Sequence, residues 1–138
     1  MKHEKRKIDF QDKRGTIMDI LVNRPFEHCV IITCNKGAVR GNHFHKYSQQ
    51  SDFVISGKMA SYGLKRGSKK IVKTVLSQND LSHWEKGEAH EFVALTKCAF
   101  LSFVKGPRGG QNYEKDTYRL NIPLHEQLKR KIIDWSVK

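Results

Sequence analysis

The chain has 138 residues, a length that fits one ordinary domain, and 38% of its residues are hydrophobic. This content supports a modest core, but no run approaches the ~20 consecutive apolar residues that a transmembrane helix needs. The N-terminal stretch MKHEKRKIDF is charged and lacks the apolar segment of a secretory signal, so we expect a soluble, cytoplasmic protein with no membrane partner.

The charge balance favours an anionic partner. Lys and Arg number 26 against 14 Asp and Glu, for a formal net charge of +12. Such an excess suits nucleic acid, acidic lipid or a phosphorylated small molecule. The basic residues are scattered, and no nucleic-acid-binding motif accompanies them. We therefore predict a basic surface and a small-molecule partner, with no nucleic acid.

The predicted elements are nearly all strands. The first alternates through Ile17, Asp19 and Leu21, after a turn-like Asp-x-x-Gly cluster. Turn signals then recur roughly every 8–12 residues, which is typical of an all-β sandwich or barrel. The remaining strands are predicted over 27–35, 38–46, 51–66 with a bend at Gly57, 69–77 and 97–104, and a turn at 78–80 precedes the stretch 81–95.

The C-terminal part reads differently. Residues 105–119 have the composition of a loop, and residues 121–135 predict a helix with Pro123 in its first turn. An apolar stripe at helical spacing would pack on the β domain or on a second subunit. Its members are Leu124, Leu128, Ile132 and Trp135.

The cysteines carry no metal or disulfide signal. Cys29, Cys34 and Cys98 are odd in number, and none forms a Cys-x-x-Cys pair. Each lies in an apolar, strand-like stretch. We predict three buried thiols that serve packing.

Two histidines stand out in the segment RGNHFHKYSQQSDFVISG. Side chains two residues apart in a strand point to the same face, so His43 and His45 would project together. Two adjacent imidazoles chelate a divalent metal or supply an acid and a base. A hydrogen-bonded pair without chemistry is the simplest alternative.

The spacing around these histidines resembles the cupin family. Gly37, His43, His45, Gln50 and Gly57 occupy the positions of the first cupin motif, with glutamine in place of its glutamate. The second motif is matched in part. The resemblance covers roughly residues 10–105 and implies one cupin (jelly-roll) β-barrel domain with a C-terminal loop and helix over about 106–138. The second-motif positions are Asn79, Glu85, Gly87, His90 and Ala94.

A narrower resemblance concerns the sugar-nucleotide branch of the cupins. FQDKRGTIMDI, RGNHFHK and GPRGGQNYEKDTYRL look like segments of dTDP-4-dehydrorhamnose 3,5-epimerases and dTDP-sugar 3,4-ketoisomerases. An epimerase-type Arg-Gly-x-His segment maps to Arg40 and His43. A ketoisomerase-type His-x-His-Lys segment followed by glutamine maps to His43, His45, Lys46 and Gln50.

The resemblance implies a homodimeric isomerase or epimerase of a nucleotide-linked keto sugar in polysaccharide precursor biosynthesis, with no required cofactor. His43 and His45 would move protons. Tyr113 and Tyr118 are candidates to gate the site or to act as acids, or else surface residues at a dimer contact. The implied substrate-binding set is Arg40, Lys46, Gln50 and Tyr118.

Two other functions stay open. His43, His45, Gln50 and His90 would form a workable site for zinc, iron, nickel or manganese, as in a dioxygenase-like cupin, although a neutral amide binds a cation less strongly than a carboxylate. The alternative is a non-catalytic sugar- or effector-binding cupin. His90 is a packed core residue on that interpretation, and the GPRGG segment around Arg108 is a turn, not a phosphate cradle.

Overall fold

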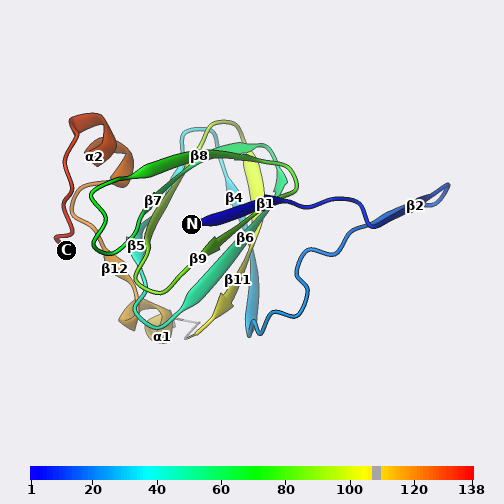
Figure 1. The fold of residues 1–138 in the computed structure, drawn as a ribbon, viewed down its shortest axis with the longest axis horizontal. Coiled ribbons are helices and arrows are strands. Elements are labelled where there is room, and N and C mark those ends of the chain that lie inside the picture. Colours follow the sequence, from blue (N-terminus) through cyan, green and yellow to red (C-terminus); the bar gives the residue numbers. More distant parts are fainter. Residues whose placement is uncertain (107–109) are drawn as a thin grey trace.

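Figure 1 shows the computed structural model of the chain, which describes residues 1–106 and 110–138. Two five-stranded antiparallel sheets form its body. The first sheet has the order β1 (Lys2–Lys5), β9 (Asp80–Trp84), β6 (Gln49–Ser56), β11 (Cys98–Lys105) and β4 (His28–Cys34). The second has the order β12 (Tyr118–Arg119), β5 (Val39–Phe44), β10 (Ala89–Ala94), β7 (Lys58–Leu64) and β8 (Val72–Ser77).

The two sheets pack face to face because strands of both contribute to one buried apolar cluster. Val54 of β6 and Phe100 of β11 meet Met59 of β7, Leu76 of β8 and Phe92 of β10 in it. The rings of Phe92 and Phe100 lie 5.5 Å apart. The prediction of a mainly β protein is therefore confirmed, and the described strands form two sheets that are not joined into a closed barrel.

The chain turns at residues that the sequence marks as turn formers. Gly57 has φ +79° and bends the chain between β6 and β7, where an added Cβ would lie 2.2 Å from the carbonyl oxygen of Lys97. Asn79 adopts φ +71°, the left-handed conformation that its place in the glycine position of the second motif requires. Phe53 of β6 and Tyr62 of β7 are buried.

The N-terminal region departs from the prediction. β1 joins the first sheet by pairing with β9, so this sheet begins before residue 10, the predicted start of the barrel. Residues 10–17 form instead a separate hairpin of β2 (Phe10–Asp12) and β3 (Gly15–Ile17). Figure 1 shows this hairpin extending away from the body of the molecule.

The predicted alternation beyond Ile17 is wrong, because side chains take the bonds that a strand would use. The backbone N–H of Asp19 donates to the Asp9 carboxylate at 2.6 Å. The carbonyl oxygen of Asp19 accepts from Nε of Arg6 at 2.8 Å. With both backbone groups engaged by side chains, residue 19 has no place in a ladder.

The C-terminal helix is shorter than predicted. α2 spans Leu124–Arg130, and Lys131 ends it with a left-handed φ of +56°. The side chain of Gln127 then binds the segment that follows, donating to the carbonyl of Asp134 at 2.9 Å and accepting from its N–H at 2.8 Å. These bonds turn the chain back along the helix, so residues 132–135 are not helical.

The predicted helical stripe is accordingly divided. Leu124 is fully buried, whereas Leu128 is 38% exposed. Trp135 leaves the helix and packs its ring against that of Phe44 at 5.6 Å.

The segment predicted as a loop contains α1 (Gly110–Lys115) and β12, and Arg108 lies outside the described residues. Cys34 and Cys98 are buried as predicted, but Cys29 is exposed on β4. Nowhere in residues 1–106 or 110–138 is there a helix long and apolar enough to cross a membrane.

Candidate active site

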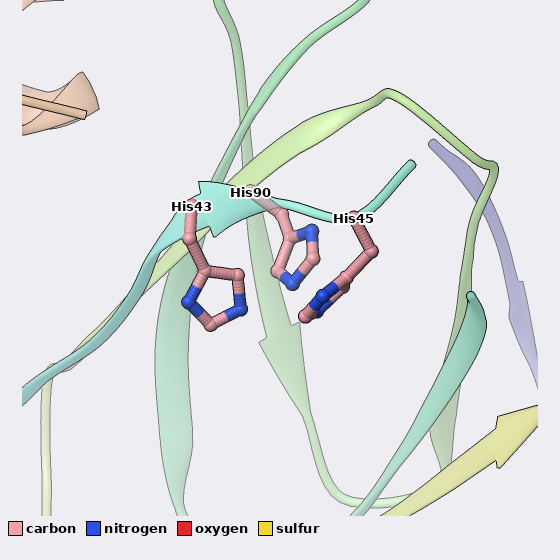
Figure 2. A group of neighbouring side chains, drawn as sticks. All are labelled: His43, His45 and His90. Carbon is pink, nitrogen blue, oxygen red and sulfur yellow. The ribbon is translucent and has the colours of Figure 1, made fainter. Parts of the chain in front are cut away.

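Three histidines meet between the two sheets, as Figure 2 shows. His43 lies on β5, His45 directly follows that strand, and His90 lies on β10 opposite His43 in the ladder. The approach of the two strands depends on Gly41, which has φ +80° and whose added Cβ would lie 2.8 Å from the carbonyl oxygen of His90. An irregularity in the ladder between His90 and Glu91 adjoins this contact.

The three rings are buried and in mutual contact. The ring of His43 lies 4.7 Å from that of His45 and 4.8 Å from that of His90, and the latter two are 5.6 Å apart. Tyr113 of α1 adds its ring at 6.4 Å from His43 and 5.5 Å from His45. The predicted convergence of these histidines is therefore present in the structure.

Backbone carbonyls fix the tautomers of two rings. Nδ1 of His45 lies 2.8 Å from the carbonyl oxygen of Asp116, and Nδ1 of His90 lies 3.3 Å from that of Glu88. A carbonyl only accepts, so each Nδ1 must carry the hydrogen, and in the neutral ring Nε2 holds the lone pair. Nε2 of His90 is buried and has no hydrogen-bond partner within the described chain.

Asp116 also holds the turn that follows His45. Its buried carboxylate accepts hydrogen bonds from the backbone N–H groups of Lys46, Tyr47 and Ser48 and from the Ser48 hydroxyl, at 2.7–3.2 Å. The same residue thus orients the His45 ring through its carbonyl and fixes the backbone beside it through its side chain.

The environment keeps two of the imidazoles neutral. Burial lowers the pKa of His43 well below its usual range, and the neighbouring rings of His90 and His45 and the charge of Arg119 lower it further. Burial, with a smaller effect of His45, lowers the pKa of His90 to about 3. At neutral pH both rings are therefore unprotonated, and each keeps a nitrogen lone pair that a metal ion or a hydrogen-bond donor can use.

Two of the three histidines, His43 and His90, border a pocket of about 620 Å³ that lies between β4, the edge of the first sheet, and the β5–β12 edge of the second. The His45 ring packs against both of them outside this lining. His43, Gln50 and His90 line the pocket together with Arg40 and Arg119. The guanidinium of Arg40 donates to the carbonyl of Thr33 across the pocket at 3.1 Å. Two permanent cations beside neutral imidazoles suit an anionic, oxygen-rich ligand.

Sequence reasoning missed Arg119. It forms a bidentate ion pair with Glu114 at 2.7 and 2.9 Å, and it faces His43 in the β12–β5 ladder. No local pattern marks it, because 76 positions of sequence separate these paired residues. The one signal available was strand alternation. If residues 118 and 119 are in a strand, the side chains of Tyr118 and Arg119 point to opposite faces, so one of them faces the pocket.

Lys46 and Tyr118, two predicted substrate-binding residues, lie elsewhere. The Lys46 ammonium stands 4.4 Å from the centre of the Tyr118 ring, and that ring stacks on Phe44 at 5.1 Å. Phe44 alternates with the pocket-lining His43, so these three side chains occupy the outer face of the second sheet. There they line a second pocket.

The side chains present fit a divalent metal. One ring nitrogen of each histidine lies within 4.8 Å of those of the other two. Zinc or iron bonds to imidazole nitrogen at ~2.0–2.1 Å, which places the nitrogens of a four-coordinate site ~3.3 Å apart, so modest ring rotations would be needed. Gln50 donates its amide nitrogen to Asp52, which leaves its oxygen as the atom for a cation.

Neither a family model nor a curated protein matches the chain. Solved structures do. A dTDP-4-dehydrorhamnose 3,5-epimerase from Sulfolobus tokodaii is 21% identical, with a TM-score of 0.74 over 99% of this chain and 81% of that one. A sugar 3,4-ketoisomerase from Thermoanaerobacterium thermosaccharolyticum, solved with TDP, is 20% identical, with a TM-score of 0.70 over 94% of this chain and 95% of that one.

A third structure is the 3,5-epimerase of Legionella pneumophila with bound dTDP-4-keto-L-rhamnose, which is 18% identical with a TM-score of 0.73 over 99% of this chain and 78% of that one. The chain has the fold of these sugar-nucleotide enzymes. The resemblance inferred from the motifs is confirmed at the level of the fold.

Proposed function

We propose that the protein is an isomerase or epimerase of a nucleotide-linked keto sugar, and that His43 and His45 move the protons. The cluster of three buried histidines, two of which line a pocket of about 620 Å³ beside two arginines, carries this proposal. The likeness in fold to enzymes that act on such sugars supports it. On this proposal the two sheets are the halves of one cytoplasmic cupin jelly-roll domain over residues 1–138.

The chemistry follows from the ketone. A carbonyl acidifies the hydrogens on its neighbouring carbons, so a near-neutral base can remove one of them. His43, which burial keeps unprotonated, accepts that proton, and the negative enediolate that forms beside it stabilises the resulting imidazolium. His45, oriented by the Asp116 carbonyl, exchanges protons with the oxygens of the enediolate. If the proton returns to the former carbonyl carbon, the keto group moves to the neighbouring position. If it returns to the opposite face of the carbon it left, the configuration of that carbon is inverted.

The arginines are assigned to the diphosphate. Arg40 and Arg119 line the pocket on β5 and β12, close to the base. A planar guanidinium binds phosphate oxygens in pairs, and it stays charged at any working pH. Tyr113, whose ring lies beside His43 and His45, is the tyrosine we assign to the site, in place of Tyr118.

Deuterium uptake tests proton abstraction directly. In D₂O, the protein should exchange the carbon-bound hydrogen next to the ketone of dTDP-4-keto-L-rhamnose or of another nucleotide-linked 4-keto sugar. His43→Ala should slow this exchange by about 10²–10⁴-fold while leaving the thermal shift caused by the sugar nucleotide. His28→Ala, on β4, is the matched control.

Two results would contradict the assignment. Exchange that survives His43→Ala unchanged would exclude His43 as the base. A stabilising shift with dTDP-, UDP- or GDP-sugars, without exchange even in the wild-type protein, would identify a non-catalytic binding module.

A metal-dependent enzyme is the second candidate, favoured by the buried, unpartnered Nε2 of His90. His43, His45 and His90 would hold the ion with Gln50 as a weaker oxygen ligand. A bound divalent metal supplies a Lewis acid and an open coordination position. Mass spectrometry of protein purified without chelators should then find about one zinc, iron, nickel or manganese per chain, lost in His90→Ala. Metal-free protein would exclude this candidate.

We propose a homodimer as the working form. The extended β2–β3 hairpin exposes Phe10 by 50% and Ile17 by 61%, and an isolated two-stranded hairpin is marginal in water. A second copy of the chain would cover these side chains. Sedimentation should give a dimer for the wild type and a monomer for Phe10→Asp/Ile17→Asp. A monomeric wild type would refute this assembly.

A further inference from the structure

A second pocket, of about 590 Å³, lies on the outer face of the second sheet. It includes the two predicted substrate residues that the histidine pocket lacks, Lys46 and Tyr118. Phe44 and Trp135 contribute two more aromatic rings, and Arg66 adds a second cation from the β7–β8 turn. We call it the outer pocket.

The aromatic side chains form a preorganised surface. Phe44 and Tyr118 are stacked with an angle of 13° between their planes, and Trp135 meets Phe44 edge-on at 71°. The backbone holds Trp135 in place, because Asn121 donates to the carbonyl of Ser136 at 2.9 Å. Phe44 is only 5% exposed, so it supports the other two rings, and a planar ligand would meet Tyr118 and Trp135 already in place.

The cations stand over these rings. The guanidinium of Arg66 lies 5.1 Å from the centre of the Trp135 ring and 5.6 Å from that of Phe44, and the ammonium of Lys46 lies 4.4 Å from that of Tyr118. Within residues 1–106 and 110–138, no salt bridge involves Arg66 or Lys46.

The turn beside Arg66 strengthens this positive field. It carries a further exposed cation, Lys69, whereas its Lys65 and Lys70 line a different pocket beside Glu88. The outer pocket thus combines a flat apolar surface with positive charge that no described carboxylate neutralises. This combination suits a ligand with a planar ring and a phosphate group.

We propose that the outer pocket binds a nucleoside phosphate, with its base against Trp135 and Tyr118 and its phosphates between Arg66 and Lys46. Aromatic faces accept any base by stacking, and guanidinium and ammonium groups bind phosphate oxygens. The site is separate from the histidine pocket and does not depend on the proposed reaction. Its ligand is either a free nucleotide or the nucleotide half of a sugar nucleotide.

The two tryptophans of the chain report on the two pockets separately. Trp135 lines the outer pocket, whereas the Trp84 ring lies 5.0 Å from that of His90. Protein labelled with 5-fluorotryptophan gives two ¹⁹F resonances, which Trp135→Phe assigns. Titration with dTDP should move the Trp135 resonance, and Lys46→Ala/Arg66→Ala should weaken that response at least tenfold. Lys73→Ala, which removes a cation 5.8 Å from the Tyr62 ring, is the matched control and should not.

Titrations with other ligands distinguish nucleotide binding from the alternative explanations. A dTDP-linked sugar that moves Trp135 with the affinity of dTDP indicates that the nucleotide half suffices, and a much tighter response indicates that the sugar is also bound. Inorganic pyrophosphate binding as tightly as dTDP would overturn the proposal by showing an anion site without base recognition. A response confined to Trp84, or an oligonucleotide that binds far more tightly than dTDP, would overturn it too.

Discussion

The side-chain amide of Gln50 donates hydrogen bonds to both carboxylate oxygens of Asp52, at 2.9 and 3.0 Å. Both residues belong to β6 and are buried. Burial raises the pKa of Asp52 to about 6, and the bonds from Gln50 and Ser102 counteract this rise. The buried Asp52 carboxylate therefore requires a hydrogen-bond donor at position 50. Glutamine supplies this donor, whereas the glutamate of the cupin motif would not.

Gln50→Glu should destabilise the protein by about 3 kcal/mol, because two buried carboxylates would then face each other without a donor. Asp52→Asn should rescue it, since an asparagine amide can donate to Glu at position 50. Urea unfolding of the four variants of this double-mutant cycle, with EDTA at pH 7.5, measures the coupling. A Gln50→Glu variant as stable as the wild type would show that the contact does not constrain position 50.

Acid should destabilise the protein through the histidine cluster. The folded state holds the pKa of His90 at about 3, against 6.5 for the ordinary group. Below pH 6.5 the unfolded chain therefore binds a proton that the folded chain does not, and stability falls with pH. Between pH 6.5 and 4.5 the loss is about 2–3 kcal/mol, at ~1.36 kcal/mol per pH unit.

Urea unfolding in EDTA across this range, compared with His90→Asn, measures the effect. The variant lacks the titrating group, so its curve should be flatter than that of the wild type by this amount. Parallel curves would mean that His90 does not titrate differently in the two states.

Arg119→Ala should raise KM for a nucleotide sugar by roughly 10–150-fold and change kcat little, because a charge-assisted bond to phosphate is worth about 1.5–3 kcal/mol. Arg130→Ala, at the end of α2, is the matched control. Steady-state kinetics separates the two constants. A fall in kcat at constant KM would instead assign Arg119 to the chemical step.

Gly57→Ala should destabilise the protein by about 2–4 kcal/mol, because the new methyl group would collide with the carbonyl oxygen of Lys97 and with Cys98. Gly37→Ala is the matched control: φ there is +86°, but nothing lies within 4 Å of an added Cβ. Only the ~1 kcal/mol cost of the left-handed backbone applies to it. Equal losses in thermal unfolding would show that backbone strain, not the collision, limits both positions.

Much of the histidine site could be predicted because its signals are local. His43 and His45 share a face by strand alternation, and the Gly-x-x-His spacing marked His90. The same alternation, applied one residue further, would have placed Lys46 on the opposite face. The assignment of Lys46 and Tyr118 to the substrate followed family segments, which carry no information about sidedness.

The features that were missed depend on contacts between distant residues. Arg119 reaches the pocket only through the pairing of β12 with β5. The early end of α2 depends on the bonds from Gln127 to Asp134 and on the left-handed Lys131, whereas the apolar spacing alone continues to Trp135. Hydrophobic periodicity records which side chains are apolar, not where a polar side chain redirects the backbone.

The paired strands β5 and β12 form the wall between the two pockets, with His43 and Arg119 on one side and Phe44 and Tyr118 on the other. Loss or gain of one residue in β5 ahead of this pair would exchange the two linings, turning imidazole outward and phenyl inward. Substitutions can therefore adjust either pocket separately, but a change of chain length in this strand would alter both at once. Insertions between Val39 and Lys46 should therefore hardly be tolerated.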